Sequence, residues 1–438
     1  MNGKQGGSVV DQIEIISPEA VLASKSLMRR YLILELARYS AFSISGMFII
    51  LYLLDTLPLL EVGIVFAVSY FITTFVDYPT GALGDAIGHK QVLILAYIFH
   101  LISFALLIVS DTFIPLLLYS ALSAFAASQE SGALEAWFDN SYRLANEQID
   151  PDREIYKAFQ ARKAILFHII LGSSFIIGGI IAFEFSRKIL FGVSFIGVFM
   201  VFFLIIVLMT NIRDSESKMT FKTYFHRFSS GIRFFVSDKG IFLYFIGSTI
   251  TWAANNSIWV NYLLFPTYAN YTGGSDNLTA LIRAVIFASG VLWQLIAIRF
   301  ISKIKRVNLW IFITTTLSNP VFFFLVYLYY WIAPPTTVDL ALIFGLFLVF
   351  QLPGMWESLE FTLRNQLNLD LVPDKLRNSI YSLLPTITTL IGIPGTIFGS
   401  WFISLYSFTA GILLTAIISL IGVLIVGIGL KTIQGKQT

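Results

Sequence analysis

Several acidic residues of this chain lie within long apolar stretches, where a charge requires a partner or a function. Glu130 lies near the middle of one such stretch, with Gln129 and Ser131 beside it and no cation one helical turn away. A charge at the centre of a bilayer costs about 2.5–3.5 kcal/mol on insertion scales, and hydrocarbon favours a protonated carboxyl group. We therefore take Glu130 as the first candidate for a carboxylate that exchanges protons, against the alternative of a neutral, hydrogen-bonded packing residue.

A second apolar stretch contains Glu357 and Glu360. Glu357 lies deeper in this stretch than Glu360 and is our next proton-coupling candidate. Pro353 and Gly354 precede Glu357 by one turn, so we expect a kink there that frees a backbone carbonyl near a cavity. Asp77, at the end of another stretch, is the third proton-coupling candidate.

Acidic and basic residues recur at helical spacing in the same two stretches. They are Glu135, Asp139 and Arg143 at i, i+4 and i+8, and Glu357, Glu360 and Arg364 at i, i+3 and i+7. Such spacing places each set on one helix face. Because both sets end in an arginine near a membrane boundary, a charged gate and a water-facing surface fit the pattern equally well.

Aromatic and amide side chains also share one predicted helix face. Trp252, Asn255, Asn256 and Trp259 occupy positions i, i+3, i+4 and i+7. This face could stack against and hydrogen-bond a flat or amphipathic solute, whereas packing between helices through asparagine is the competing interpretation. Further candidates for the same cavity wall are Tyr39, Gln294, Gln351 and Trp356.

Two arginines lie inside apolar stretches. Arg38 is three residues from Glu35, so the two charges could neutralise each other, or Arg38 could extend to the membrane surface. Arg283 could bind an anionic substrate or extend outward. Both arginines are cavity candidates, whereas His100 and His168 have no metal-ligand spacing and fit hydrogen-bonded packing positions.

The composition indicates which environment holds these residues. Of 438 residues, 56% are hydrophobic and only 13% are charged, about half of the usual quarter for soluble proteins. This excludes several soluble domains, a disordered chain and a nucleic-acid-binding module. The absence of Cys excludes disulfides and thiolate metal sites. We expect no metal site and no cofactor.

Twelve stretches have the roughly 20 apolar residues that a membrane-spanning helix needs. They lie near 31–54, 61–83, 91–110, 115–139, 160–183, 189–209, 241–265, 278–300, 309–332, 338–363, 379–404 and 408–430. The longest polar interruption, 210–240, divides them six plus six, and 131–140 weakly resembles 356–365. The prediction is an all-α membrane protein with two pseudo-symmetric six-helix bundles.

Positive charges predict the orientation, because short cytoplasmic loops retain Lys and Arg. Loops on one side hold 25 of the 29 Lys and Arg residues, and the opposite loops hold only Arg187 and Lys188. Both termini are therefore expected in the cytoplasm, without a cleaved signal peptide. The predicted parts are a leader (1–30), a bundle (31–209), a loop (210–240), a second bundle (241–430) and a tail (431–438).

The turn at 77–93 carries a recognisable motif. Six positions match G-x-L-x-D-R-x-G-R-K-x-x-L, namely Gly81, Leu83, Asp85, Gly88, Lys90 and Leu93, while Ala86 and His89 replace its arginines. Here the chain resembles the major facilitator superfamily. The resemblance implies that Gly81, Asp85, Gly88, His89 and Lys90 belong to a cytoplasmic gate, in which Asp85 accepts hydrogen bonds from a helix starting near Asn378. Glu135, Asp139, Arg143, Glu360 and Arg364 are further gate candidates.

Asp77-Tyr-Pro-Thr-Gly and the segment 131–139 resemble a prokaryotic branch of that superfamily that includes drug exporters. The resemblance implies a monomeric, multi-pass protein of the cytoplasmic membrane that is not an enzyme. From the sequence as a whole, our first hypothesis is proton-coupled export of a hydrophobic or amphipathic small molecule by alternating access, with Glu130 as the exchanging carboxylate. The expected partners are this substrate, protons and the lipid bilayer, with no nucleic acid.

Three other functions remain open at this point. The first is uptake of a polar or anionic solute that binds at Arg38 or Arg283. The second is a non-transporting membrane receptor. The third, a lipid-modifying enzyme, would need a nucleophile, a base and metal ligands grouped at one interface, and the sequence offers no such grouping.

Overall fold

The computed structural model describes residues 18–146, 149–150, 153–210, 229–230, 232–301, 303–372 and 374–437. Within these ranges the side chains of 77–86, 374–383 and a few single residues are not described. Most of the predicted leader and most of the predicted central loop therefore lie outside the described residues.

The described chain consists of helices joined by short connections. The first set is α1 (Pro18–Thr56), α2 (Leu59–Ile87), α3 (His89–Val109), α4 (Phe113–Glu130), α5 (Ala133–Asn146), α6 (Glu154–Glu184) and α7 (Arg187–Leu208). The second is α9 (Lys239–Ala253), η1 (Ala254–Leu263), α10 (Leu264–Tyr271), α11 (Asp276–Ile301), α12 (Val307–Thr316), η2 (Leu317–Val321), α13 (Phe322–Ile332), α14 (Leu340–Val349), α15 (Gln351–Leu371), α16 (Asp374–Leu405) and α17 (Phe408–Gln437). We call these sets the N-terminal and C-terminal groups.

Ten helical segments in the described part of the chain are long and apolar enough to cross a membrane. The predicted spans outside this set are 115–139 and 241–265, and neither is a continuous α-helix. The first is interrupted between Glu130 and Ala133, where Gly132 has φ 70°, a conformation that side chains disfavour. The second passes into η1, a π-helix of ten residues.

Two helix boundaries lie earlier along the chain than the sequence indicated. The kink expected at Pro353 and Gly354 lies earlier, at Phe350 between α14 and α15. A proline ring obstructs the carbonyl four residues before it, so the helix opens on the N-terminal side of the proline. The sequence predicts that the first helix begins near residue 31, after the leader, but α1 begins at Pro18 and continues unbroken to Thr56.

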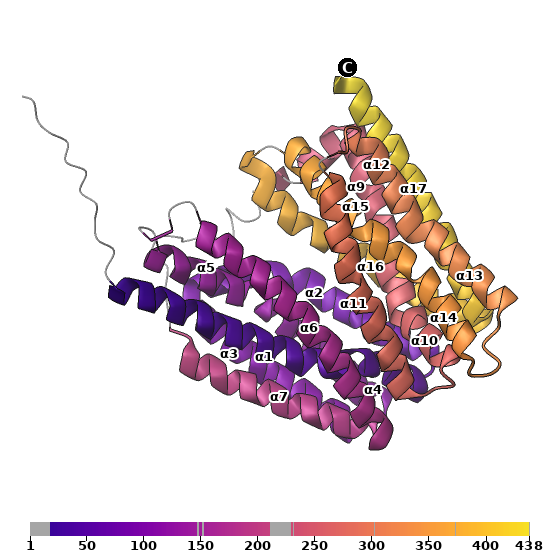
Figure 1. Ribbon diagram of the computed structural model, residues 1–438, viewed down its shortest axis with the longest axis horizontal. Coiled ribbons are helices and arrows are strands. Elements are labelled where there is room, and N and C mark those ends of the chain that lie inside the picture. The colour runs from indigo at the N-terminus through magenta and orange to yellow at the C-terminus, as the bar shows by residue number, and fades with distance from the viewer. Residues whose placement is uncertain are drawn as a thin grey trace, which may run out of the picture.

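The two groups meet at one end and diverge toward the other (Figure 1). The main contacts between them run along α2 with α16 and along α6 with α11. The ends that diverge carry the start of α1 and the end of α17, at the left and the top of Figure 1. We call this side the open end and the opposite side the junction end.

An ion-pair bridge links the groups at the junction end. Arg187 of α7 donates two hydrogen bonds to Asp276 of α11, at 3.0 and 2.8 Å, and a third to Asp55 of α1 at 2.5 Å. The backbones also come close here, because a Cβ placed on Gly179 would meet the Ala280 Cβ at 2.4 Å. The junction end is therefore closed by both charge and packing.

Candidate functional site

Charged side chains from five helices form a network inside the N-terminal group. Arg38 of α1 lies at its centre, with Nη atoms 2.7 Å from Glu35, 3.2 Å from Glu130 and 3.6 Å from Glu135. Arg38 thus forms the expected pair with Glu35 and does not extend to the membrane surface. We call this set the N-terminal cluster; it consists of Tyr31, Glu35, Arg38, Tyr97, His100, Glu130, Glu135 and Lys163.

Glu130 is enclosed by partners from other helices. His100 Nε2 and Tyr97 Oη of α3 each lie 3.1 Å from its carboxylate oxygens, and the residue is 7% exposed. Its helix carries no cation one turn away, as the sequence indicated, but Arg38 of α1 supplies the positive charge. Glu130 is therefore a hydrogen-bonded ion-pair partner in this conformation.

Glu35 is fully buried and is held from two sides. Tyr31 donates to it at 2.9 Å, and Lys163 of α6 lies 3.4 Å away. The sequence analysis assigned no site role to Lys163, Tyr31 or Tyr97, because Lys163 counts there only as a boundary cation. Tyr31 lies one turn before Glu35 on the same helix, so its spacing could have indicated this contact. Lys163 and Tyr97 give no such signal, since they reach the cluster from α6 and α3 through helix packing.

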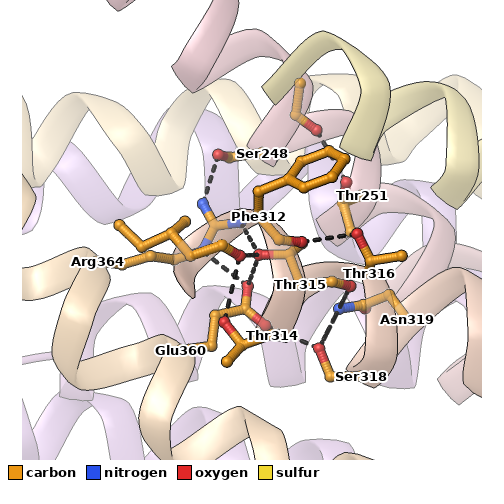
Figure 2. Close-up of polar contacts among 12 residues, drawn as sticks. Ser248, Thr251, Phe312, Thr314, Thr315, Thr316, Ser318, Asn319, Glu360 and Arg364 are labelled. Atoms are coloured by element: carbon orange, nitrogen blue, oxygen red, sulfur yellow. Dashed lines mark hydrogen bonds and ion pairs between the residues drawn. The ribbon is translucent and has the colours of Figure 1, made fainter. Parts of the chain in front are cut away.

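The C-terminal group contains a smaller network, which consists of Arg364, Glu360 and hydroxyl groups. Arg364 donates to Glu360 at 2.7 Å, and both side chains lie on α15. Figure 2 shows the surrounding hydroxyls: Ser248 accepts from Arg364 at 2.6 Å, and Thr315 donates to Glu360 at 2.9 Å. Ser318 adds a second donor to Glu360 at 2.8 Å. In this network the charges of Glu360 and Arg364 neutralise each other.

Two neighbouring cavities border this network. The first, about 410 Å³, is lined by Trp252, Asn255 and Asn256 together with Glu360 and Arg364. The second, about 310 Å³, lies along α11 and is lined by Arg283, Trp259 and Gln294, with His168 from the N-terminal group. We call them the α15 cavity and the α11 cavity. Asn255 and Glu357 line both.

Glu357 differs from the other intramembrane acids. It has neither a hydrogen bond nor an ion pair within the part of the chain that the structure describes, and it is exposed to solvent through the cavities. Arg283 likewise forms no ion pair with the described residues, and its buried Nε has no hydrogen-bond partner there. Phe175 and Phe265 flank its guanidinium, with ring centroids 5.7 and 5.9 Å away. Arg283 thus lines the α11 cavity.

The π-helix η1 changes the face predicted for the seventh span. Trp252 and Asn256 line only the α15 cavity, while Trp259 lines the α11 cavity. Trp259 is 3% exposed, and its ring packs against Phe323 at a centroid distance of 5.3 Å. The wider π-helical turn divides a face that α-helical spacing would have kept together. Such turns are frequent at functional sites.

The remaining predicted wall residues have separate positions. Gln351 accepts a hydrogen bond from Trp293 at 3.0 Å. Tyr39 packs edge-on against Phe167, at 4.3 Å between centroids, and lies under the Arg38 guanidinium. The structure places neither Tyr39, Gln351 nor Trp356 among the residues of the two cavities.

The predicted gate residues are only partly described. The side chains of Asp77, Gly81 and Asp85 lie outside the described set, as does the start of α16 that the resemblance implies as their partner. Gly88 has φ 96°, in keeping with a turn that needs glycine. Lys90 donates to the carbonyls of Ile206 and Met209 at 2.7 and 2.8 Å, so it caps the end of α7.

The other gate candidates do not form one group. His89 lies at the start of α3. Asp139 accepts a hydrogen bond from Tyr156 at 2.5 Å, and Arg143 is exposed at the end of α5. Glu135 and Glu360 belong to two different networks in two different groups.

The described residues contain no group of three or more His, Asp and Glu that could hold a metal ion. The charges of the N-terminal cluster and of Glu360 with Arg364 form ion pairs, whereas Glu357 and Arg283 line the α11 cavity without an ion pair to any described residue. The geometry can therefore bind and orient a polar solute and exchange protons at a carboxylate.

Comparison with known proteins places the fold. No protein-family model and no curated protein matches this chain. A mutant of the nucleoside transporter NupG has a similar structure, with a TM-score of 0.75 at 15% identity over 91% of this chain and 98% of that one.

Other transporters have the same architecture. The peptide transporter POT in complex with alafosfalin has a TM-score of 0.68 at 11% identity, covering 95% of this chain and 99% of that one. An inward-facing bacterial homolog of the human lysosomal transporter Spinster has a TM-score of 0.64 at 12% identity, covering 96% and 98%. The chain therefore has the same fold as these transporters.

Proposed function

We propose that this protein is a secondary active transporter that exports a hydrophobic or amphipathic small molecule in exchange for protons. In this proposal the chain crosses the cytoplasmic membrane twelve times, with both termini in the cytoplasm, and works as a monomer by alternating access. The open end then faces the cytoplasm and the junction end faces outward.

The observation that carries the proposal is the position of Glu357. Its carboxylate lines both cavities and has no cation within ion-pair distance among the described residues. A carboxylate without a fixed partner can bind either a proton or a cationic group of the substrate, and this competition couples the two movements. We therefore rank Glu357 ahead of Glu130, which Arg38, His100 and Tyr97 already hold.

The junction end supports the alternating-access part of the proposal. Arg187 joins the two groups by a bidentate pair with Asp276, so this bridge must break before the cavities can open outward. The other contacts between described residues of the groups reach part of the way toward the open end, for example the hydrogen bond from Thr74 to Thr389 at 2.7 Å.

Inverted membrane vesicles with a pH-sensitive quenched dye would test the proposal. We expect at least one member of a panel of amphipathic amines and zwitterions to release protons and restore fluorescence in wild type, and Glu357→Gln to abolish this response. Glu130→Gln should retain a partial response. Glu184→Gln is the control, since Glu184 is exposed at the end of α6. A full response in Glu357→Gln would contradict our assignment of the carrier.

A second candidate function is uptake of a polar or anionic solute, and Arg283 favours it. This arginine lines the α11 cavity without an ion-pair partner in the described chain, so it could bind an anion. Accumulation of a labelled anion in right-side-out vesicles under an inward proton gradient would support uptake. Accumulation in inverted vesicles would support export.

A further inference from the structure

Two opposite charges face the α11 cavity without pairing with each other. Glu357 lies on α15 and Arg283 lies on α11, and both side chains line this cavity. Neither forms an ion pair with any described residue. By contrast, Glu360 pairs with Arg364, and Glu130 pairs with Arg38. The α11 cavity therefore contains a carboxylate and a guanidinium that form no ion pair with each other or with another described residue.

The rest of the cavity wall combines aromatic and aliphatic side chains with amide and hydroxyl groups, among them Asn255, Gln294 and Ser318. Trp259, Phe322, Phe350 and Leu264 line one part of it, and Phe287 lines another. His168 of the N-terminal group stacks on Phe287 with 5.2 Å between ring centroids. Such a wall can enclose an apolar or aromatic body, while a few polar groups fix its orientation.

We propose that the α11 cavity binds a small zwitterion with an apolar body, its ammonium group at Glu357 and its acidic group at Arg283. A ligand with only an ammonium group would leave the Arg283 guanidinium unpaired, and one with only an acid would leave Glu357 unpaired. Since an unpaired charge in a partly desolvated site is costly, the cavity discriminates against both single-charge ligands.

This inference rests on the proposed function and specifies its substrate class. The ammonium group and the exchanged proton would compete for one carboxylate, Glu357. The cavity volume of about 310 Å³ limits the ligand to a small molecule. His168 comes from the other group of helices, so movement between the groups would open or reshape the wall.

Calorimetric titration of the purified full-length protein in detergent tests the inference with two matched series of probes. The first series is phenylalanine, phenethylamine and 3-phenylpropionate, in which the charges are close together. The second is 4-(aminomethyl)benzoate, benzylamine and benzoate, in which the charges are far apart. We expect one zwitterion to bind at least about tenfold more tightly than either single-charge relative, because hydrogen bonds to charged groups contribute at least this factor.

Substitutions then test whether Arg283 and Glu357 bind the two charged groups of the ligand. Arg283→Gln should lower the affinity for the zwitterion to that of the amine, and Glu357→Gln should lower it to that of the acid. Arg283→Lys, which keeps the charge, should retain part of the preference. Arg299→Gln and Glu184→Gln are matched controls, because both residues are exposed. Circular dichroism and a size-exclusion profile verify that each variant is folded.

Two results would overturn the inference: equal affinity of the zwitterion and the amine in folded wild type, or no binding of any of the six probes. The proposed function is measured separately by proton flux. If wild type binds the zwitterion as expected but shows no proton flux, the transport function is refuted and the zwitterion site is retained. If wild type shows proton-coupled flux of another compound but no preference for a zwitterion in the titrations, the zwitterion site is refuted and the transport function is retained.

Discussion

The two groups of helices treat intramembrane charge in different ways. In the N-terminal cluster, Arg38 links three carboxylates from three helices, and Lys163 adds a second cation. In the C-terminal group, the pair of Glu360 and Arg364 lies within one helix, and Glu357 and Arg283 line a cavity without an ion pair to any described residue. The difference indicates that charge in the first group holds helices together, whereas charge in the second group is available to a ligand.

Arg38→Gln should give the largest loss of stability. It leaves Glu35 and Glu130 without their shared cation, and removal of one partner of a buried ion pair costs about 3–5 kcal/mol. Thermal unfolding in detergent, followed by circular dichroism, measures the loss. Arg143→Gln, at an exposed position on α5, is the control. A loss as small as the control's would show that the cluster does not hold the helices.

Arg364→Gln should cost less, about 1–3 kcal/mol, because Glu360 keeps two hydroxyl donors. The same unfolding measurement applies, with Arg299→Gln on the surface of α11 as its control. If Arg364→Gln costs as much as Arg38→Gln, the contrast between a multi-helix network and a single-helix pair is wrong.

Arg187→Gln should weaken the bridge between the groups and raise the population of the state open at the junction end. Ser400 is a suitable reporter, because it is 0% exposed and lies against Gly63. The chain has no cysteine, so Ser400→Cys supplies the only thiol. We expect its labelling by a maleimide to become about fivefold faster in Arg187→Gln, which corresponds to about 1 kcal/mol of coupling.

Lys188→Gln is the matched control for that experiment. Lys188 is next to Arg187 but pairs with Asp111, at 2.6 Å, within the N-terminal group. Its loss should leave the labelling rate unchanged. Equal acceleration by both substitutions would mean that local disturbance, rather than the link between the groups, controls access.

Asp111→Asn should have the smallest effect on stability, and the size of this effect should depend on pH. Hydrogen bonds from Lys188 and Tyr52 lower the pKa of Asp111 from its usual 3.8. Because the folded-state pKa is lower than the unfolded one, this interaction stabilises the protein above about pH 4 and is lost as the pH falls through the folded-state pKa. Asp111→Asn should therefore lower the unfolding midpoint at pH 7 but not at the acidic end of the titration. An equal difference at every pH would contradict this.

Local features of the sequence predicted much of the layout. The apolar stretches correspond to helices, and ten described helical segments meet the requirements of a membrane span. The pair of Glu35 and Arg38 could also be predicted, because residues three apart face the same side of a helix. The interruption at Gly132 and the π-helix at Ala254–Leu263 could not be, since both depend on how neighbouring helices pack.

The sequence by itself determined that acids and bases lie inside apolar helices, because hydropathy and helical spacing are properties of short segments. Only the tertiary structure decided which of these charges are paired. Glu130 has no cation on its own helix, yet Arg38 reaches it from a position 92 residues away in the chain, while no described cation lies within ion-pair distance of Glu357. An ion pair forms over a few ångströms in space, and helix packing sets those distances independently of separation along the chain.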